Sequence, residues 1–452
     1  MSKVIGIDLG TTFSAIASLD DLGNPEVLAS IEDNRKITAS AVYLKDNEVI
    51  VGDKALNYLK DQSNNVILQT KREMENDVVY STDEGKWVTD KDLVDAYTPA
   101  QVSSLILKKL KEYTSDVKKV VITVPAMFAE KARQATLDAA KIADLEVIEL
   151  INEPTAAVLH YASLPGVEVG GRVMIFDLGG GTFDVTFAEV KNKKVDVMTS
   201  RGDKYLGGRD FDKEITKLMK KKYFDVHNVE IDIENNKEYI HKAEEVKKIL
   251  SVKDKANIEI TGPKGSQKIE ITQEEFEESI QTYIEKIKML IEEAMEASGM
   301  NPSRINQTLL VGGSTRMPII TKVLTQMMGK PPVKGVNVDE AVVCGAAIYA
   351  GLKTEKETLS DQQQEALKEV NLTDVCNFYM GTLAYVTDSH TGRRVVANTI
   401  IIERDTKLPV SVTKRYTTIS EGQEELECNV TQSEGPEDNR EFVNIIHEEM
   451  LK

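Results

Sequence analysis

Apolar residues along this chain occur in short continuous runs and in stripes with helical spacing. The runs, which predict buried strands, lie at residues 4–17, 120–128, 146–150, 173–190 and 308–314. The stripes, which predict helices, lie at about 130–144, 154–162 and 317–328. Because strands alternate with helices, we expect an α/β architecture with largely parallel sheets.

Capping patterns mark the start of two helices. Thr98 and Gln101 have the spacing of a capping box ahead of an apolar stripe. Thr272 and Glu275 repeat that spacing, and they predict a single long helix that ends near Gly299.

Two segments resemble each other. Residues 4–17 and 173–190 each contain an apolar strand, an Asp-Leu-Gly turn and a Thr-Phe pair in the same order, so that Asp8 aligns with Asp177. This order favours a duplicated domain. The alternative is a chance similarity between two hairpins with glycine turns.

The C-terminal part of the chain has a different pattern. Residues 354–372 are polar and predict a linker with a short helix. The strand-like runs beyond it lie at 383–387, 394–402, 408–418 and 425–430. They predict a small β region of a size that is marginal for an independent sandwich.

Charge and composition restrict the partners. The 452 residues include 56 Lys and Arg and 74 Asp and Glu, a formal net charge of −18. Such a surface repels nucleic acid and anionic membranes, so we expect neither as the main partner. The three cysteines form no CxxC pair, which disfavours a zinc site and favours a reducing compartment. The start of the chain has no pattern of a leader peptide, and we expect a cytoplasmic protein.

The paired Asp-Leu-Gly turns are candidates for phosphate binding. Turns rich in Gly and Thr present backbone N–H groups and hydroxyls to an anion. Asp8 and Asp177 at the strand ends would repel a phosphate unless a divalent cation lay between them, so the pairing predicts a Mg²⁺-nucleotide in a cleft. The segment 311-VGGSTRMP-318 adds a close backbone approach and Arg316, whose guanidinium is able to stack on a base. An ordinary strand-to-helix turn is the alternative for that segment.

Seven motifs carry a resemblance to a known family. They are IDLGTTFS, VITVPAMF, INEPTAAVLHY, FDLGGGTFDV, YLGGRDFD, VGGSTRMP and VDEAVVCGAA. In this order they resemble the seventy-kilodalton heat-shock chaperones of the DnaK type, in the actin and sugar-kinase superfamily. The resemblance implies a duplicated actin-like ATPase domain at 1–353, with lobes at about 1–165 and 166–353 around a nucleotide cleft. A linker at 354–372 and an incomplete all-β domain, a partial sandwich at 373–452, would follow.

The resemblance also implies roles for individual residues. The catalytic set would be Asp8, Lys71, Glu153, Asp177 and Thr182. Asp8 and Asp177 would hold hydrated Mg²⁺, with potassium as a further cation. The residues that would bind ATP or ADP are Gly10, Thr11, Thr12, Gly179, Gly180, Gly181, Gly207, Gly208, Glu244, Lys247, Lys248, Ser251, Gly312, Gly313, Ser314, Arg316 and Asp339. Without the resemblance, Lys71 is typical of a solvated surface lysine, and the helix face at 244–251 is typical of solvated ion pairs.

Pro125, Arg133 and Asp374 resemble the residues that couple nucleotide state to the outside in this family. The linker 370-VNLTDV-375 departs from the family pattern, because Asn371 and Thr373 stand at apolar positions. A less apolar linker should bind the ATPase domain less firmly. The β region lacks the later strands and the helical lid, which predicts weak peptide binding, instability or dimerisation.

Three functions compete. The resemblance favours an ATP-driven chaperone with unfolded or peptide clients, a J-domain co-chaperone and a nucleotide exchange factor as partners. A nucleotide-switched interaction module without peptide binding is the second. A small-molecule kinase of the same superfamily is the third, since the duplicated phosphate turns alone allow it.

Overall fold

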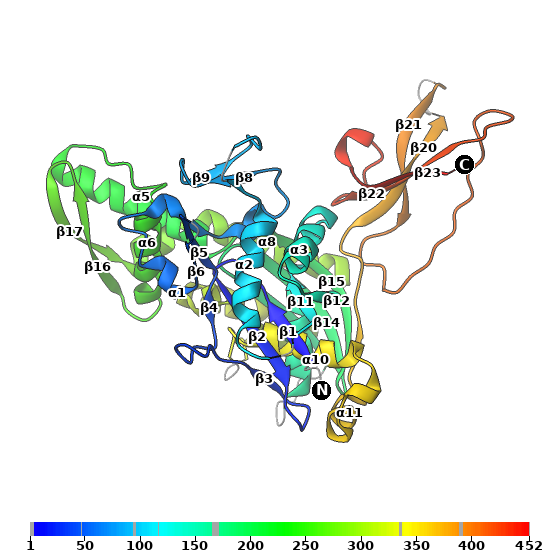
Figure 1. Ribbon diagram of the computed structural model, residues 1–452, viewed down its shortest axis with the longest axis horizontal. Helices are drawn as coiled ribbons and strands as arrows, with labels where there is room; N and C mark the ends of the chain where they lie inside the picture. The colour runs from blue at the N-terminus through cyan, green and yellow to red at the C-terminus, as the bar shows by residue number, and fades with distance from the viewer. Residues whose placement is uncertain are drawn as a thin grey trace.

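The computed structural model describes residues 4–46, 48–93, 96–115, 117–164, 171–333, 337–387 and 392–451. Two halves, each built on a central sheet, form the main body, and a smaller sheet near the C-terminus extends from it (Figure 1). Within the main body, the segment with α5, α6, β16 and β17 projects on the side opposite to the C-terminal sheet (Figure 1).

The first central sheet has the strand order β12-β11-β1-β2-β3, and β4 pairs with β2. Its strands are β1 (Ile5–Asp8), β2 (Phe13–Leu19), β3 (Pro25–Val27), β4 (Thr38–Ala39), β11 (Lys119–Val124) and β12 (Glu146–Asn152). Strand β1 is parallel to β11 and antiparallel to β2. The turn between β1 and β2 therefore lies at the carboxyl end of β1, where Asp8 is the last residue.

The second central sheet repeats this arrangement with the order β18-β13-β14-β15-β19. Its strands are β13 (Gly171–Leu178), β14 (Phe183–Lys191), β15 (Lys194–Asp203), β18 (Gln307–Val311) and β19 (Asn371–Thr373). Strand β13 is parallel to β18 and antiparallel to β14, as β1 is to β11 and β2. The expectation of largely parallel sheets is wrong, because the hairpin in each half makes each sheet mixed.

Two helices hold the halves together. Helices α4 (Glu153–Ser163) and α10 (Ala341–Lys353) are buried along nearly their whole length, in a core shared by both sheets. A Cβ on Gly345 would lie 1.8 Å from the carbonyl oxygen of Ala156, and a Cβ on Gly6 would lie 2.2 Å from the backbone nitrogen of Ala347. Small residues are therefore required where the helices cross each other and the first sheet.

Further elements surround the sheets. In the first half they are α1 (Asp53–Leu56), α2 (Pro99–Lys111), α3 (Glu130–Ile142), β5 (Ala41–Lys45), β6 (Glu48–Val51), β7 (Val66–Leu68), β8 (Val79–Ser81), β9 (Lys86–Val88) and β10 (Ala96–Tyr97). In the second half they are α5 (Gly208–His227), α6 (Lys237–Leu250), α7 (Gln273–Ser279), α8 (Gln281–Ser298), α9 (Pro318–Met328), β16 (Lys255–Gly262) and β17 (Gly265–Thr272).

Both capping boxes form, at Thr98 with Gln101 and at Thr272 with Glu275. The single long helix after Thr272 is a wrong prediction, because Ile280 leaves the helical conformation and separates α7 from α8. Buried Ile280 is part of the core of the second half, so tertiary packing fixes the break where no Gly or Pro marks it. Helix α8 ends at Gly299 with a φ of 64°, as the sequence predicts.

The C-terminal sheet has the order β21-β20-β22-β23. Its strands are β20 (Tyr379–Thr387), β21 (Arg394–Ile402), β22 (Leu426–Ser433) and β23 (Asn444–Leu451), and α11 (Asp361–Leu367) precedes it. Residues 408–418 form no strand, which corrects that prediction: most of their side chains are exposed and no neighbouring strand pairs with them. Strand β23 has no counterpart among the predicted strands.

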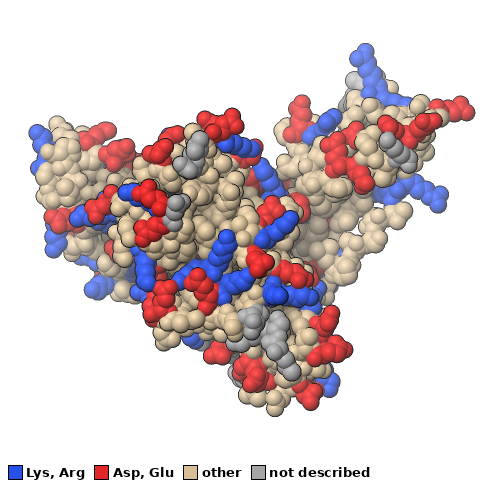
Figure 2. Space-filling model, in the orientation of Figure 1, with Lys and Arg blue, Asp and Glu red and all other residues tan. Residues whose placement is uncertain are grey.

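Lys, Arg, Asp and Glu are interspersed over the visible face of the molecule (Figure 2). The three cysteines are free. Within the described ranges, no helix is long and apolar enough to cross a membrane.

Candidate functional site

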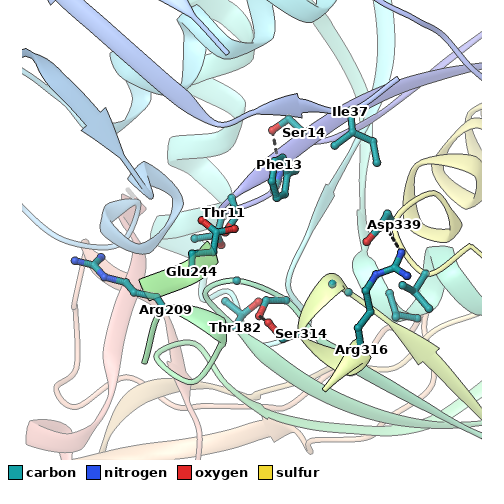
Figure 3. A pocket seen from close by; sticks show the side chains of 18 of the residues that line it. Thr11, Phe13, Ser14, Ile37, Thr182, Arg209, Glu244, Ser314, Arg316 and Asp339 are labelled. Carbon is teal, nitrogen blue, oxygen red and sulfur yellow. Dashed lines mark hydrogen bonds and ion pairs between the residues drawn. The ribbon is translucent and has the colours of Figure 1, made fainter. Parts of the chain in front are cut away.

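A cavity of about 930 Å³ lies between the two halves. The turn after β1, the turn after β13, helix α6 and the segment 312–317 line it. In Figure 3, Thr11, Thr182 and Ser314 lie near the middle of the pocket, with Arg209 on one side and Arg316 and Asp339 on the other.

The two glycine turns face each other across this cavity. A Cβ on Gly180 would lie 1.9 Å from Thr12 Oγ1, and one on Gly181 would lie 2.5 Å from Thr11 Cγ2. A Cβ on Gly207 would lie 2.7 Å from the Gly181 nitrogen. Only glycine fits these positions, so the backbone itself forms the wall, and backbone N–H groups near a hydroxyl form a concave site for an anion.

Four carboxyl groups lie behind the turns. Burial is the first cause that raises the pKa of Asp8, Glu153, Asp177 and Asp184, and it raises the pKa of Asp184 to about 8. Thr123 Oγ1 donates a hydrogen bond of 2.7 Å to Asp8 Oδ1. The buried Asp177 Oδ2 has no partner among the described residues. This orphaned oxygen, in an acidic cluster, fits a site that holds a cation.

Lys71 is the lysine of this cluster. It is buried, with 6% of its surface exposed, and it forms an ion pair with Glu153. The preceding turn brings it there, because Gln69 has a φ of 59° and ends the strand before the short helix Thr70–Glu73. A non-glycine residue in this conformation is typical of a position held by a functional constraint.

Helix α6 lines the opposite wall. Glu244, Lys247, Lys248 and Ser251 all reach the cavity, as their shared helix face predicts. Lys247 donates to the carbonyl oxygen of Gly208 at 2.9 Å and forms an ion pair of 2.8 Å with Asp212. Lys248 pairs with Glu244 at 2.7 Å and lies 5.4 Å from the centre of the Phe13 ring.

The segment after β18 closes the cavity. Gly312 has a φ of 83°, and a Cβ there would lie 2.5 Å from the carbonyl oxygen of Leu178. Ser314 Oγ donates to the carbonyl oxygen of Gly179 at 3.0 Å, which joins this segment to the second glycine turn. Arg316 forms an ion pair with Asp339 at one side of the pocket (Figure 3). The half-exposed Arg316 guanidinium offers a flat surface to a planar ligand.

Most of the candidate residues line one cavity. These are Asp8, Gly10, Thr11, Thr12, Lys71, Glu153, Asp177, Gly179, Gly180, Thr182, Glu244, Lys247, Lys248, Ser251, Gly312, Gly313, Ser314, Arg316 and Asp339. Three candidate glycines, Gly181, Gly207 and Gly208, do not line the cavity but lie directly behind residues that do. Gly181 lies against Thr11, Gly208 against Ser314, and Gly207 against Gly180 and Gly181.

Several lining residues were missed by the sequence reasoning. They are Phe13, Arg35, Gln69, Asp53, Arg209 and Asp212. Arg209 and Asp212 belong to the quoted motif YLGGRDFD, so the motif itself was the available signal. Phe13 likewise belongs to the quoted motif IDLGTTFS. Gln69, Arg35 and Asp53 carry no local signal, because folding alone brings Arg35 and Asp53 to the cavity, where they form an ion pair of 2.5 Å.

The three candidate coupling residues lie outside this cavity. Arg133 donates to Asn152 Oδ1 at 2.6 Å, and Asn152 Nδ2 donates to Asp374 Oδ2 at 3.1 Å. Asn152 directly precedes Glu153, so Asp374 is linked to the cleft through one residue. Pro125 follows the last residue of β11, and its carbonyl oxygen accepts a hydrogen bond from the Phe128 nitrogen at 3.1 Å.

Comparison with known proteins identifies the family. The family model for the Hsp70 protein matches residues 4–444. The chaperone protein DnaK of Thermotoga neapolitana is 34% identical over 454 aligned residues, which cover 96% of this chain and 71% of that protein. The chaperone protein DnaK of Thermotoga petrophila matches to the same extent.

The chain therefore belongs to the Hsp70 family. Its members are ATP-dependent chaperones with ATPase activity, and they bind ATP or ADP with Mg²⁺. Two mixed sheets around a cleft, followed by a β region, form the two-lobed actin-like fold that the resemblance implies.

Proposed function

We propose that this chain hydrolyses ATP in the cleft between its two halves. The observation that carries the proposal is the pair of glycine turns that face each other, at Gly180 and Thr12, over a buried acidic cluster. The cavity is large enough for a nucleotide. The predicted boundaries at 353 and 372 remain predictions, and β19 extends the second sheet into the predicted linker.

Asp8 and Asp177 are the residues that would hold Mg²⁺ together with the phosphates. Within the described part of the chain, no group of three or more His, Cys, Asp or Glu side chains is arranged to hold a metal ion. This fits Mg²⁺, which keeps several waters and uses one or two carboxylates and the substrate phosphates. When bound, the ion would neutralise phosphate charge. Potassium is proposed as a further cation near these carboxylates.

The chain's own residues supply position and charge for the transfer of the terminal phosphoryl group to water. The turns at 10–12 and 179–182 hold the phosphates through backbone N–H groups, and Thr182 adds a hydroxyl. Lys71 brings a positive charge to the transferred group, and Glu153 orients Lys71 through their ion pair. In such a site, position and charge stabilisation provide nearly all of the catalysis.

The nucleoside would occupy the side of the cavity with Arg316. Arg316 is fixed by Asp339, and Lys247 by Asp212 and the carbonyl oxygen of Gly208. A planar base would lie against the Arg316 guanidinium, while the α6 side chains contact the sugar. Pairing within the protein keeps these side chains in place before the nucleotide arrives.

Contacts between the C-terminal sheet and the main body support coupling of hydrolysis to client binding. Arg201 forms a bidentate pair with Asp405, with hydrogen bonds of 3.1 and 2.9 Å. Asn377 Nδ2 donates to the carbonyl oxygen of Ala126 at 2.8 Å, one residue after Pro125. With Asp374 bound to Asn152, these contacts join the β region to the segment that carries Glu153.

A single open sheet also favours the second candidate, a nucleotide-switched module without peptide binding. Strands β21 and β23 form the edges of the sheet, and no second layer covers it within the described ranges. Unfolded clients, a J-domain co-chaperone, an exchange factor and a cytoplasmic location are parts of the chaperone proposal. A small-molecule kinase is the third candidate.

The test is the steady-state rate of ATP hydrolysis with and without an unfolded model peptide. The chaperone proposal expects Mg²⁺-dependent turnover that rises when the peptide is added. Turnover without any response to peptide or to a J-domain protein would favour the second candidate. Turnover that requires a sugar would favour the kinase.

A further inference from the structure

Arg209 is a cationic residue of the cleft whose backbone lies against the second glycine turn. Arg209 lies in the first turn of α5, and its backbone nitrogen donates to the carbonyl oxygen of Gly180 at 2.8 Å. The neighbouring Gly208 nitrogen donates to the carbonyl oxygen of Gly179 at 3.0 Å. The start of α5 is thus fixed to the second glycine turn, and Arg209 lines the cavity beside it.

The Arg209 guanidinium has no partner of its own. Its Nε atom is buried, and no hydrogen bond or ion pair joins the side chain to any residue that the structure describes. The other arginines that line the cavity are paired: Arg35 with Asp53, and Arg316 with Asp339. Arg209 is therefore an exception among the arginines that face the cleft.

The acidic residues near Arg209 form hydrogen bonds or ion pairs with other residues, and no hydrogen bond or ion pair joins them to its guanidinium. Asp210 accepts from Arg72, Asp212 pairs with Lys247, and Glu73 accepts from Asn76 at 2.8 Å. Burial, followed by repulsion from Arg72, lowers the pKa of Arg209. The Arg209 side chain is partly buried, and Asp210, Glu73 and Asp212 attract it without accepting a hydrogen bond from it. A partly buried guanidinium whose donors lack an acceptor is costly, so an anion that contacts Arg209 would stabilise it.

The position of Arg209 in the pocket indicates which anion would bind to it. Figure 3 places Arg209 on the side of the pocket opposite to Arg316 and Asp339. If the base lies at Arg316, the polyphosphate extends past Thr11 and Gly180 towards Arg209. A guanidinium offers paired N–H donors that match the oxygens of a phosphate group.

We propose that Arg209 binds the terminal phosphate of a nucleoside triphosphate and thereby makes the cleft favour ATP over ADP. This inference rests on the proposed function, because it requires a nucleotide in the cleft. Arg209 would add a cation from the second half of the molecule to the charge that Lys71 brings from the first. In the absence of triphosphate, no acceptor among the described residues contacts its guanidinium, and the terminal phosphate would supply one.

The experiment compares the dissociation constants of a non-hydrolysable Mg-ATP analogue and of Mg-ADP by titration calorimetry. The full chain is used as wild type, Arg209→Gln and Arg209→Lys. A charged hydrogen bond contributes about 1.5–3 kcal/mol, a factor of roughly 10 to 150 in affinity. We expect Arg209→Gln to weaken binding of the triphosphate by about that factor and binding of ADP by less than about threefold. Arg209→Lys keeps the positive charge but lacks the paired N–H donors of the guanidinium, and we expect an intermediate loss of triphosphate affinity.

Two control variants sharpen the result. Arg316→Gln, on the other side of the cavity, should weaken both nucleotides equally. Arg304→Gln, an exposed arginine whose Nη1 contacts the carbonyl oxygen of Gly299, should change neither. Equal losses for the two nucleotides in Arg209→Gln, or no loss in a variant that melts like the wild type, would overturn the inference alone. A wild-type chain that binds neither nucleotide would overturn the proposed function and this inference with it.

Discussion

The main body and the C-terminal sheet differ in how their apolar residues are used. In the main body, each central sheet is covered, and helices α4 and α10 fill a core shared by both halves. In the C-terminal sheet and its connections, large apolar side chains remain exposed: Tyr385, Val386, Val395, Leu408, Val412, Tyr416, Ile419, Leu426, Val430, Phe442, Ile445, Met450 and Leu451. The proposed nucleotide cleft is therefore preformed, whereas the C-terminal sheet presents an open apolar surface.

The largest expected effect concerns the cleft. Lys71→Ala should lower single-turnover hydrolysis by roughly 10²–10³, because it removes one charge contact to the transition state. Binding of the nucleotide should stay within about threefold, since backbone groups provide most of the phosphate contacts. Quenched-flow hydrolysis and calorimetry measure the two separately. Equal losses in binding and turnover would contradict the assigned role of Lys71.

A glycine in each region tests the difference in packing. Gly345→Ala places a Cβ 1.8 Å from the Ala156 carbonyl oxygen, and it should destabilise the main body by about 3 kcal/mol through overpacking. Gly435→Ala, beside β22, meets only the flexible end of Glu437 at 3.2 Å and should change stability by less than about 0.5 kcal/mol. Urea unfolding followed by circular dichroism measures both. Similar changes in the free energy of unfolding for the two substitutions would contradict the difference in packing between the two regions.

Burial in α4 makes the main body sensitive to acid. His160 has a pKa lowered by burial to about 4, while an unfolded histidine titrates near 6.5. The unfolded chain takes up the proton first as the pH falls, so stability is lost between about pH 6.5 and pH 4. This residue should account for about 2 kcal/mol between pH 7 and pH 5.

The check on this prediction is the urea midpoint of the wild type and of His160→Gln at the two pH values. The variant should lose less stability on acidification than the wild type. An identical loss in both proteins would contradict a lowered pKa of His160 in the folded state.

The smallest effect concerns the connection between the regions. Asp374→Asn removes the charge that lies among Asn152, Thr155 and Arg133, and it should reduce peptide stimulation of hydrolysis by about two- to fivefold. Basal hydrolysis should change little, because Asp374 does not line the cavity. Asp361→Asn, an exposed acid in α11, is the matched control. If peptide stimulates hydrolysis by Asp374→Asn as much as by the wild type, Asp374 has no role in coupling.

How much was predictable from the sequence depends on how local the signal is. Asp8, Asp177 and the glycine turns carry local patterns, and the structure brings these residues to one cavity. The burial of Lys71 depends on the backbone conformation of Gln69 and on the ion pair with the distant Glu153, which no local pattern contains. The separation of α7 from α8 at Ile280 likewise follows from packing.

The C-terminal sheet shows the opposite case. Residues 408–418 alternate in the manner of a strand, yet they have no neighbouring strand with which to pair. A strand depends on a partner more than a helix does, so the pattern alone predicts it wrongly. That no described residue accepts a hydrogen bond from the Arg209 guanidinium is also a property of the fold, because only the structure shows that its acidic neighbours contact other residues instead.

The most direct test of the account is phosphate release from ATP by the purified chain, with Mg²⁺ and with EDTA, in wild type and in Lys71→Ala. We expect steady release by the wild type with Mg²⁺, and release lower by at least about 10² in EDTA and in the variant. Equal release in Lys71→Ala and wild type, or release that is indifferent to Mg²⁺, would contradict the claim that this cleft is an ATPase site.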